Sequence, residues 1–595
     1  MPDVIKKHFT WLIAIGFSAL NFLLSLRYVG FVMFDEDPWI AIYGAKRILE
    51  GQLLYRNFFD FVTPGTDYVL AGIFSIFGTK LTVAQFAVVL SNAAVTAIVV
   101  FMSFDIIKNK WLRLLPGLLF SLYSAYVYYV SHHWFILLPV ILVLSTGIQI
   151  VTSGTAKPHK WFFSGLATAG AFLFIQSIGV TLLGMLVLFI IWYYTGSNSR
   201  PAEAWMNSNG HPDSSVIPAK AGIHRFFAIL RMTTGHWIEH QVRNDRNDSK
   251  KKSNPNKSYR REILLRSVIY YISGFFIPII FVVIVFALSG SLSAFIYDSF
   301  VWPFSHYRAI NLSTPSDLLR LCIKELSSNG FIMGIIYSFV AYFGILLSLM
   351  AFVYTAFKVK KDKTRELSLV AFVSFFCIGI VAGLLPNPPA FHLMVFTPVY
   401  MLAIIVIFEY APFWSSGLIK AGFYFYFLSI TLVISYNAYR YFLAYNNPVN
   451  AFKVFRTPIG KVKMYKEYKD MPYISYPYPF LKEPGIKLPK YIFVLYWSPS
   501  VYMLTGTDNP TPLNTYAPYY NTREQAMSVI NALRSSHTRV IIIDNRIDFI
   551  KKRIGWLIHN QRVFSAEDPL ISYIHTHYRL EKVIPGYKIY TLVKQ

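Results

Sequence analysis

Long apolar runs alternate with short polar or basic segments from the N-terminus to about residue 440. A run of roughly 20 apolar residues is long enough to cross a bilayer as a helix. This rule predicts a polytopic α-helical membrane protein with about eleven transmembrane helices. They lie near residues 9–31, 82–104, 112–130, 134–151, 161–179, 181–195, 265–288, 331–357, 367–385, 391–409 and 417–440. Lys6 and Lys7 precede the first run, which lacks an obvious cleavage site, so we interpret it as an uncleaved span.

The pattern changes after the last predicted span. Short apolar runs of strand type appear in "YIFVLYW", "RVIIID" and "YKIYTLVKQ", and "TREQAMSVINALRSS" has helical spacing. We therefore predict a transmembrane domain over residues 1–440 and a C-terminal α/β domain over residues 441–595.

Residues 196–262 differ from both parts, because they are polar and basic and show little periodicity. This composition is typical of a partly disordered cytoplasmic insertion. The segment contains "SSVIPAKAGIH", which resembles the peptide read from short interspersed DNA repeats that enter bacterial coding frames. We expect no chemistry there.

Charge supports a membrane topology. Only 14% of the residues are charged and the net charge is +26, whereas soluble domains carry roughly 25% charged residues. If the helices alternate, five basic clusters fall on one side, which the positive-inside rule assigns to the cytoplasm. These clusters are Lys6/Lys7, Lys108–Arg113, Lys157/Lys160, residues 243–261 and Lys358–Arg365. The positive charge therefore indicates topology, and we expect no nucleic-acid partner.

This topology places the N-terminus in the cytoplasm. Residues 32–81, residues 289–330 and the C-terminal domain then lie outside. Residues 62–80 are short and are broken by Pro64 and Gly65, so we interpret them as a helix at the membrane surface. A true span there is the alternative, but it would invert the topology downstream.

Two cysteines provide neither a disulfide framework nor a zinc site.

Three carboxylates, Asp35, Glu36 and Asp37, follow the first span directly. The next segment, "PWIAIYGAKRILEG", has helical spacing and is expected to lie along the membrane. Carboxylates at a helix N-terminus are favoured in their charged form. An ionised carboxylate at the membrane edge can act as a base or a cation ligand. A solvated helix end is the alternative interpretation, and for Asp37 a capping role beside Pro38 suffices.

The stretch "FDEDPWIAIYGAKRILEGQLLYRNFFDFVTPGTDYVLAGIFSIFG" resembles the membrane glycosyltransferases of GT-C architecture. It is most similar to the bacterial branch related to protein O-mannosyltransferases, the lipid A aminoarabinose transferase and the lipopolysaccharide galacturonosyltransferases. The C-terminal "SPSVYMLTGTDNPTP" and "RVIIID" are similar to the periplasmic tail of that branch. The resemblance covers most of the chain except residues 196–262.

This resemblance implies an inverting transfer on the outer face of the bacterial cytoplasmic membrane. The sugar comes from a polyprenyl-phosphate donor, and a protein, lipid or glycan hydroxyl accepts it. Asp35 matches the family's catalytic acidic residue, and Glu36 is its usual neighbour, which orients it or helps to hold a cation. The resemblance leaves open whether a divalent metal ion is required, and it implies no other cofactor.

Four outward-facing residues are candidates for the donor phosphate, because Arg and His side chains can clamp phosphate oxygens. They are Arg56, His306, Arg308 and His392. Interfacial anchoring is the alternative for each. Many relatives also carry an acidic residue in the short second outer loop, where this chain has "VSHHWFIL". There His132 and His133 replace the acid as ligand or proton carrier, or only begin a helix.

Two other classes remain as alternatives. A transporter or flippase of lipid-linked sugars would bury ionisable residues in mid-membrane. A polymerase or ligase of surface polysaccharide would carry its essential residues in a late outer loop such as 289–330. The sequence identifies neither the sugar nor the acceptor.

Overall fold

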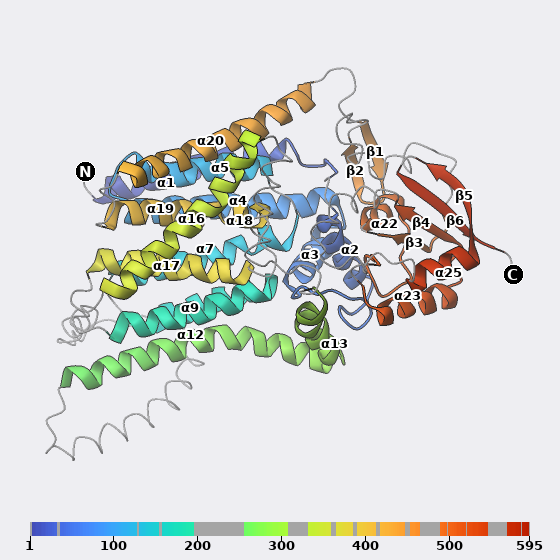
Figure 1. Ribbon diagram of the computed structural model, residues 1–595, viewed down its shortest axis with the longest axis horizontal. Helices are drawn as coiled ribbons and strands as arrows, with labels where there is room; N and C mark the ends of the chain where they lie inside the picture. Colours follow the sequence, from blue (N-terminus) through green and yellow to red (C-terminus); the bar gives the residue numbers. More distant parts are fainter. Residues whose placement is uncertain are drawn as a thin grey trace, which may run out of the picture.

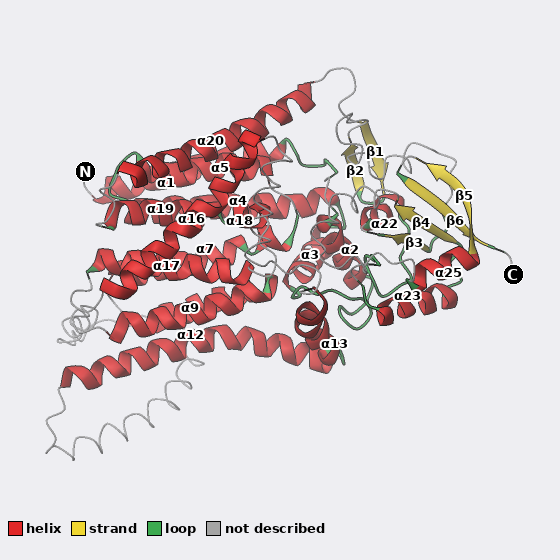
Figure 2. Cartoon of the chain, in the orientation of Figure 1, coloured by secondary structure: helices red, strands yellow, loops and turns green. Residues whose placement is uncertain are grey.

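The chain forms a bundle of long helices with an α/β region at one end (Figures 1 and 2). The computed structural model describes residues 3–32, 36–127, 130–153, 158–195, 255–307, 331–358, 364–384, 390–411, 417–446, 453–464, 488–496, 498–518, 521–544, 568–584 and 586–593. Most of the predicted insertion lies outside these ranges. Its last residues, from Pro255, belong to a long helix instead.

Each predicted span coincides with a helix. The helices are α1 (Asp3–Leu26), α4 (Leu81–Ile106), α5 (Leu115–Val127), α7 (Leu137–Ser153), α8 (Pro158–Phe174), α9 (Gln176–Thr195), α12 (Pro255–Leu288), α16 (Phe331–Lys358), α17 (Arg365–Leu384), α19 (Thr397–Tyr410) and α20 (Gly417–Asn446). In the described part of the chain, seven helices are long and apolar enough to cross a membrane. The predicted class, a mostly helical membrane protein, is confirmed, whereas the number of eleven spans stays a prediction.

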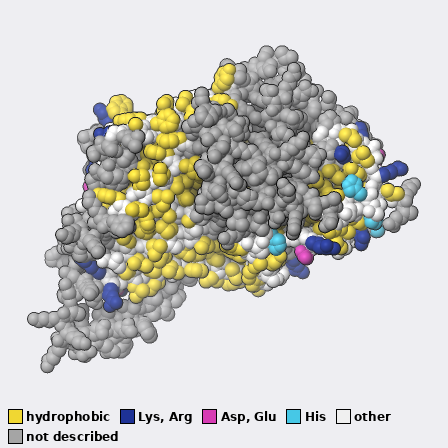
Figure 3. All heavy atoms as spheres, viewed as in Figure 1, with side chains coloured by type: hydrophobic (Ala, Val, Ile, Leu, Met, Phe, Trp, Pro, Cys, Tyr) yellow, Lys and Arg dark blue, Asp and Glu magenta, His cyan; other side chains and the backbone are white. Residues whose placement is uncertain are grey.

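Hydrophobic side chains cover one face of the bundle, with basic side chains near the bundle's far end (Figure 3). On α12, Phe281 and Leu288 are among the most exposed apolar side chains of the molecule. A surface of this kind is stable against lipid rather than water.

The break between α8 and α9 falls at residue 175, earlier than the sequence predicted. The side-chain amide of Gln176 donates to the carbonyls of Phe61 and Ser299, both at 2.9 Å. The Thr63 hydroxyl donates to the carbonyl of Phe172 at 2.7 Å. Contacts from segments far away in the sequence therefore fix this break, which local hydrophobicity did not locate.

Two short helices, α2 (Asp37–Leu49) and α3 (Gly65–Phe77), lie between the bundle and the α/β region (Figure 1). Helix α2 packs between α3 and α22 (Pro499–Thr505), and most of its residues are buried. The expectation that α2 lies along the membrane stays a prediction. Residues 62–80 do contain a helix. Its Ile76 and Phe77 are 75% and 63% exposed, while Asp67 is buried.

The α/β region contains a hairpin and a mixed sheet. The hairpin pairs β1 (Lys453–Thr457) with β2 (Gly460–Met464). The sheet has the order β3-β4-β6-β5, with β3 (Ile492–Leu495) parallel to β4 (Val540–Asp544) and with antiparallel pairing of β6 (Tyr587–Leu592) to β4 and β5 (Tyr578–Ile584). Helices α22, α23 (Arg523–Ser535) and α25 (Pro569–His577) complete it. A capping box of Thr522 and Gln525 begins α23.

Several short elements complete the described chain and position the side chains of the site. They are η1 (Leu112–Leu114), α6 (His132–Phe135), α13 (Leu292–Ile296), the π-helical turns η2 (Tyr297–Val301) and η3 (Pro303–Tyr307), and α18 (Ala390–Val395). Helix α6 packs against α3, α4 and α18.

Candidate active site

The acidic segment after α1 is anchored on both sides of Asp35. Asp35 itself lies outside the described residues. Before it, the backbone N–H of Val32 donates to the carbonyl of Lys463 in β2 at 2.9 Å. After it, Glu36 is the N-cap residue of α2 and Asp37 is the first residue of the helix, so the capping position expected for Asp37 belongs to Glu36.

Glu36 is buried, with 5% of its surface exposed. Its two carboxylate oxygens accept hydrogen bonds from the hydroxyl of Ser500 at 2.8 Å and from the backbone N–H of Ser500 at 3.2 Å. Ser500 belongs to the first turn of α22, where a carboxylate satisfies helix N–H groups. This bonding favours the orienting role of Glu36 over direct contact with a substrate.

The structure brings three of the predicted site residues together, and we call His132, His133 and His392 the histidine cluster. The ring centroids of His133 on α6 and His392 on α18 are 4.0 Å apart and the rings are stacked. Those of His132 and His133 are 4.1 Å apart. His133 is buried, and its Nδ1 has no hydrogen-bond partner within the described ranges. An unsatisfied buried nitrogen is costly, so this cluster is suited to contact a polar group from outside the described residues.

Two other candidates for the donor phosphate, Arg56 and His306, have their contacts elsewhere in the structure. The Arg56 guanidinium is exposed and donates to the carbonyl of Ser289, just after α12, at 3.0 Å. His306 stacks on Trp302, and its Nδ1 is 2.7 Å from the Ser305 hydroxyl. Arg308 lies outside the described residues. Of the four candidates, only His392 is therefore seen beside the predicted histidines.

Sequence reasoning missed a second cluster of ionisable groups, the buried acid cluster of Asp60, Asp67 and Asp298. Asp60 accepts the backbone N–H of Val62 at 3.0 Å. A Cβ atom at Gly44 of α2 would stand 2.0 Å from Oδ1 of Asp67, so only glycine fits there. Asp60 and Asp67 were part of the quoted motif, but no local pattern marks a carboxylate as buried by a distant helix.

Burial raises the pKa of all three carboxyl groups in this cluster, and the charge of Asp60 adds to the effect on the other two. Burial raises the pKa of Asp60 to about 6. Burial, and then the negative charge of Asp60, raises the pKa of Asp298 to about 8. The pKa of Asp67 is raised well above its usual value by the same two causes. Desolvation disfavours the charged form of a carboxyl group, and a like charge nearby adds to the effect.

Asp298→Asn should make the protein more stable at pH 8 than the native chain. The pKa of Asp298 rises on folding from 3.8 to about 8, so the folded state holds the extra proton between these values. Stability then falls as the pH rises through this window. We expect the variant to gain on the order of 5 kcal/mol at pH 8 and nothing near pH 4, because each pH unit between the two pKa values costs the native chain about 1.4 kcal/mol.

Thermal unfolding of the detergent-purified protein across this pH range measures the difference. Glu581→Gln, which removes an exposed carboxylate of β5, is the matched control and should unfold in parallel with the native chain. If the unfolding temperature of Asp298→Asn also follows that of the native chain at every pH, the raised pKa assigned to Asp298 is wrong.

The interface between α2 and the α/β region contains further polar side chains that the sequence did not indicate. The ring of Tyr43 stacks on that of Tyr502, and its hydroxyl accepts the backbone N–H of Asn509 at 2.8 Å. Lys46 Nζ lies 2.7 Å from Oδ1 of Asp508. Arg47, which is 3% exposed, donates to Oδ1 of Asn514 at 2.8 Å. These bonds hold the α/β region over the helix that follows the acidic segment.

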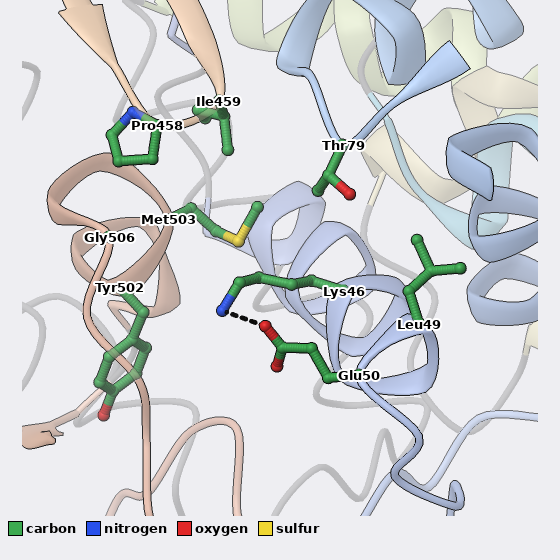
Figure 4. Close-up of a pocket in the computed structure, with 9 residues that line it drawn as sticks. All are labelled: Lys46, Leu49, Glu50, Thr79, Pro458, Ile459, Tyr502, Met503 and Gly506. Atoms are coloured by element: carbon green, nitrogen blue, oxygen red, sulfur yellow. Dashed lines mark ion pairs between the residues drawn. The ribbon is translucent and has the colours of Figure 1, made fainter. Parts of the chain in front are cut away.

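A recess of about 190 Å³ opens where this interface reaches the surface (Figure 4). Lys46 of α2 and Glu50, the residue that follows this helix, lie on one side and are paired at 2.9 Å. Met503 of α22 and the turn residues Pro458 and Ile459 of the hairpin line the other. The recess is thus a junction of three segments and is separate from the histidine cluster.

The geometry of the described residues does not indicate a metal site. Among them, no three His, Cys, Asp or Glu side chains are arranged to hold a metal ion. Asp35, which the resemblance implies as the central acidic residue, is outside that set.

Comparison with known proteins gives similar structures only. No protein-family model and no curated protein matches the chain. The archaeal oligosaccharyltransferase AglB from Archaeoglobus fulgidus, in complex with an inhibitory peptide and a dolichol-phosphate, is similar over 99% of this chain and 75% of that chain, with 13% identity and a TM-score of 0.45. ArnT from Cupriavidus metallidurans, bound to undecaprenyl phosphate, is similar over 98% of each chain, with 10% identity and a TM-score of 0.30. With TM-scores below 0.5, these likenesses assign no activity to the chain by themselves.

Proposed function

We propose that this chain is a membrane glycosyltransferase that moves a sugar from a polyprenyl-phosphate donor to a hydroxyl group. The transfer takes place at the outer face of the bacterial cytoplasmic membrane. One observation carries the proposal: the acidic segment, the histidine cluster and the α/β region meet at one end of the helix bundle. Glu36 is bonded to α22 there, and α6 with its histidines packs against α3, which in turn packs against α2.

This arrangement favours chemistry at the membrane surface over transport through it. A transporter needs ionisable groups near the middle of its spans. In the described candidate spans, Asp, Glu, Lys and Arg occur only near the helix ends. The transporter or flippase is therefore the weaker alternative.

The residues have distinct roles in this proposal. The carboxylate of Asp35 takes the proton of the acceptor hydroxyl as that oxygen attacks the anomeric carbon. The bond from that carbon to the phosphate oxygen breaks, and polyprenyl phosphate leaves with the electron pair. A single displacement of this kind inverts the anomeric centre. His133 and His392 stabilise the charge that develops on the phosphate, and Glu36 orients the acidic segment.

The test compares the native host with a strain that lacks the protein. Mass spectrometry should show that one sugar disappears from an envelope glycan, lipid or protein, while its polyprenyl-phosphate carrier accumulates. The substance that loses the sugar identifies the acceptor. If the carrier-linked sugar instead stays on the cytoplasmic side of the membrane and is not transferred, the flippase alternative is correct.

Removing residues 200–254 should leave transfer unchanged, within about twofold. The cut stops before Pro255 because α12 begins there, and a short Gly-Ser linker joins the ends. A polar, basic segment of this composition is expected to tolerate such a change. Complementation of the deletion strain measures activity, and membrane fractionation checks insertion. A variant that is inserted at native levels but inactive would show that the segment has a function.

A further inference from the structure

The β1–β2 hairpin is fixed at the ends of two candidate membrane spans. The backbone N–H of Lys463 in β2 donates to the carbonyl of Gly30, just beyond α1, at 2.7 Å. The N–H of Leu81, the first residue of α4, lies 3.4 Å from the carbonyl of Ile459 in the hairpin turn. Both α1 and α4 contain sequences long and apolar enough to cross a membrane. The hairpin therefore stands at the level where the hydrocarbon core ends.

The two faces of the hairpin differ sharply. Val462 and Met464 on the inner face, and Ile459 in the turn, are buried in the main hydrophobic core. The outer face carries Arg456 and Lys461, which are exposed and directly opposite each other across the strands. Val454, also on the outer face, is 56% exposed and opposite Lys463.

Like charges directly opposite each other destabilise an antiparallel pair. Here no acidic residue relieves the repulsion within the hairpin, since "KVFRTPIGKVKM" contains none. Within the described ranges, no ion pair involves Arg456 or Lys461. Glu50, which lines the recess beside the hairpin turn, is already paired with Lys46 at 2.9 Å.

A further cation enlarges this basic surface. Lys80 is exposed directly before α4, and its Cγ lies 4.0 Å from the position of a Cβ atom on Gly460. Basic clusters predicted for the cytoplasmic side lie at the other ends of the same helices, so positive-inside topology does not account for these cations.

We propose that the hairpin binds the anionic headgroups of membrane phospholipids at the bilayer surface. Arg456, Lys461 and Lys80 contact the phosphate groups, and Val454 contacts the upper part of the acyl chains. Each basic residue at such a surface strengthens binding to anionic lipid about fivefold. The headgroups also neutralise the opposed pair of cations. Such binding would steady the hairpin turn beside the recess, and it does not depend on the proposed transferase activity.

The experiment uses the full chain in mixed micelles and measures how tightly it binds short-chain phosphatidylglycerol. Arg456→Gln with Lys461→Gln should weaken this binding about 10- to 30-fold at low salt. Arg456→Lys with Lys461→Arg keeps the charge and should bind as the native chain does. The matched control is Arg539→Gln with Arg579→Gln, which removes two exposed cations of the four-stranded sheet region; it should have no effect.

Three results would overturn the proposal. The first is unchanged binding of phosphatidylglycerol by the neutral variant, and the second is an equal loss in the control. The third is a neutral variant that loses undecaprenyl phosphate but keeps phosphatidylglycerol, because the hairpin would then belong to the donor site. In phosphatidylcholine alone the neutral variant should unfold no earlier than the native chain, since it no longer opposes two cations. Earlier unfolding would mean that the pair is structural.

Discussion

Asp35→Asn should abolish sugar transfer while the protein remains folded and inserted. The amide has nearly the same shape as the carboxylate, but it cannot accept the proton of the acceptor hydroxyl. General-base catalysis contributes roughly 10²- to 10⁴-fold, so we expect a loss of about a thousandfold. The deletion strain complemented with this variant should show the same missing sugar and the same accumulated carrier as the deletion itself.

The neighbouring carboxylates provide the controls. Asp37→Asn changes the charge at the first residue of α2 and should cost a few tenths of a kcal/mol of stability and little activity. Glu36→Gln keeps the side chain's shape but replaces one acceptor oxygen beside Ser500 with an NH₂ group. It should reduce activity less than Asp35→Asn does. If Asp35→Asn keeps native activity, the three carboxylates only form the solvated end of a helix. The transporter interpretation would then be favoured over the transferase.

Arg47→Met should destabilise the docking of the α/β region by about 3 kcal/mol. The guanidinium is buried and donates to Gln52 at 2.7 Å, to Asn514 at 2.8 Å and to the Thr511 carbonyl at 3.0 Å. It also lies over the ring of Phe58, 4.6 Å from its centroid. Methionine fills much of the volume but leaves these acceptors without a donor. Thermal unfolding in detergent and hydrogen exchange in α22 and β3 measure the loss.

Lys46→Met is the matched control from the same helix. Lys46 pairs with Asp508 and Glu50, but its side chain is 21% exposed and water can replace the lost bonds. Pairs of this kind contribute up to about 1 kcal/mol. An equal loss in both variants would show that the helix, rather than the buried guanidinium, determines the docking.

The helices could be predicted from the sequence because each depends on a local property. A run of about 20 apolar residues is a helix in lipid whatever its neighbours are. The surroundings of α2 could not be predicted in this way. Tyr43 faces a hydrogen-bonding partner in Asn509, which lies more than four hundred residues away in the chain. An amphipathic pattern predicts that one face is buried, but it does not identify the partner that covers it.

In the candidate site too, some features could be predicted from local sequence, and others depend on distant partners. His132, His133 and His392 were selected from two separate outer segments by their residue type and position, and the structure stacks two of them across that distance. The buried acid cluster was missed because carboxylates in an outer segment are expected to be solvated. The approach of α2, with Gly44 against Asp67, helps to exclude water from Asp67.

The bond between Glu36 and Ser500 has a consequence for the synthesis of the protein. It spans 464 positions of the chain. A ribosome that adds roughly 5 to 20 residues per second needs about half a minute or more to cover that distance. During this time the first span and its carboxylates are already made, but their last partner is not. The candidate site is therefore completed late: Glu36 is made early, but it is oriented only after Ser500 has been synthesised.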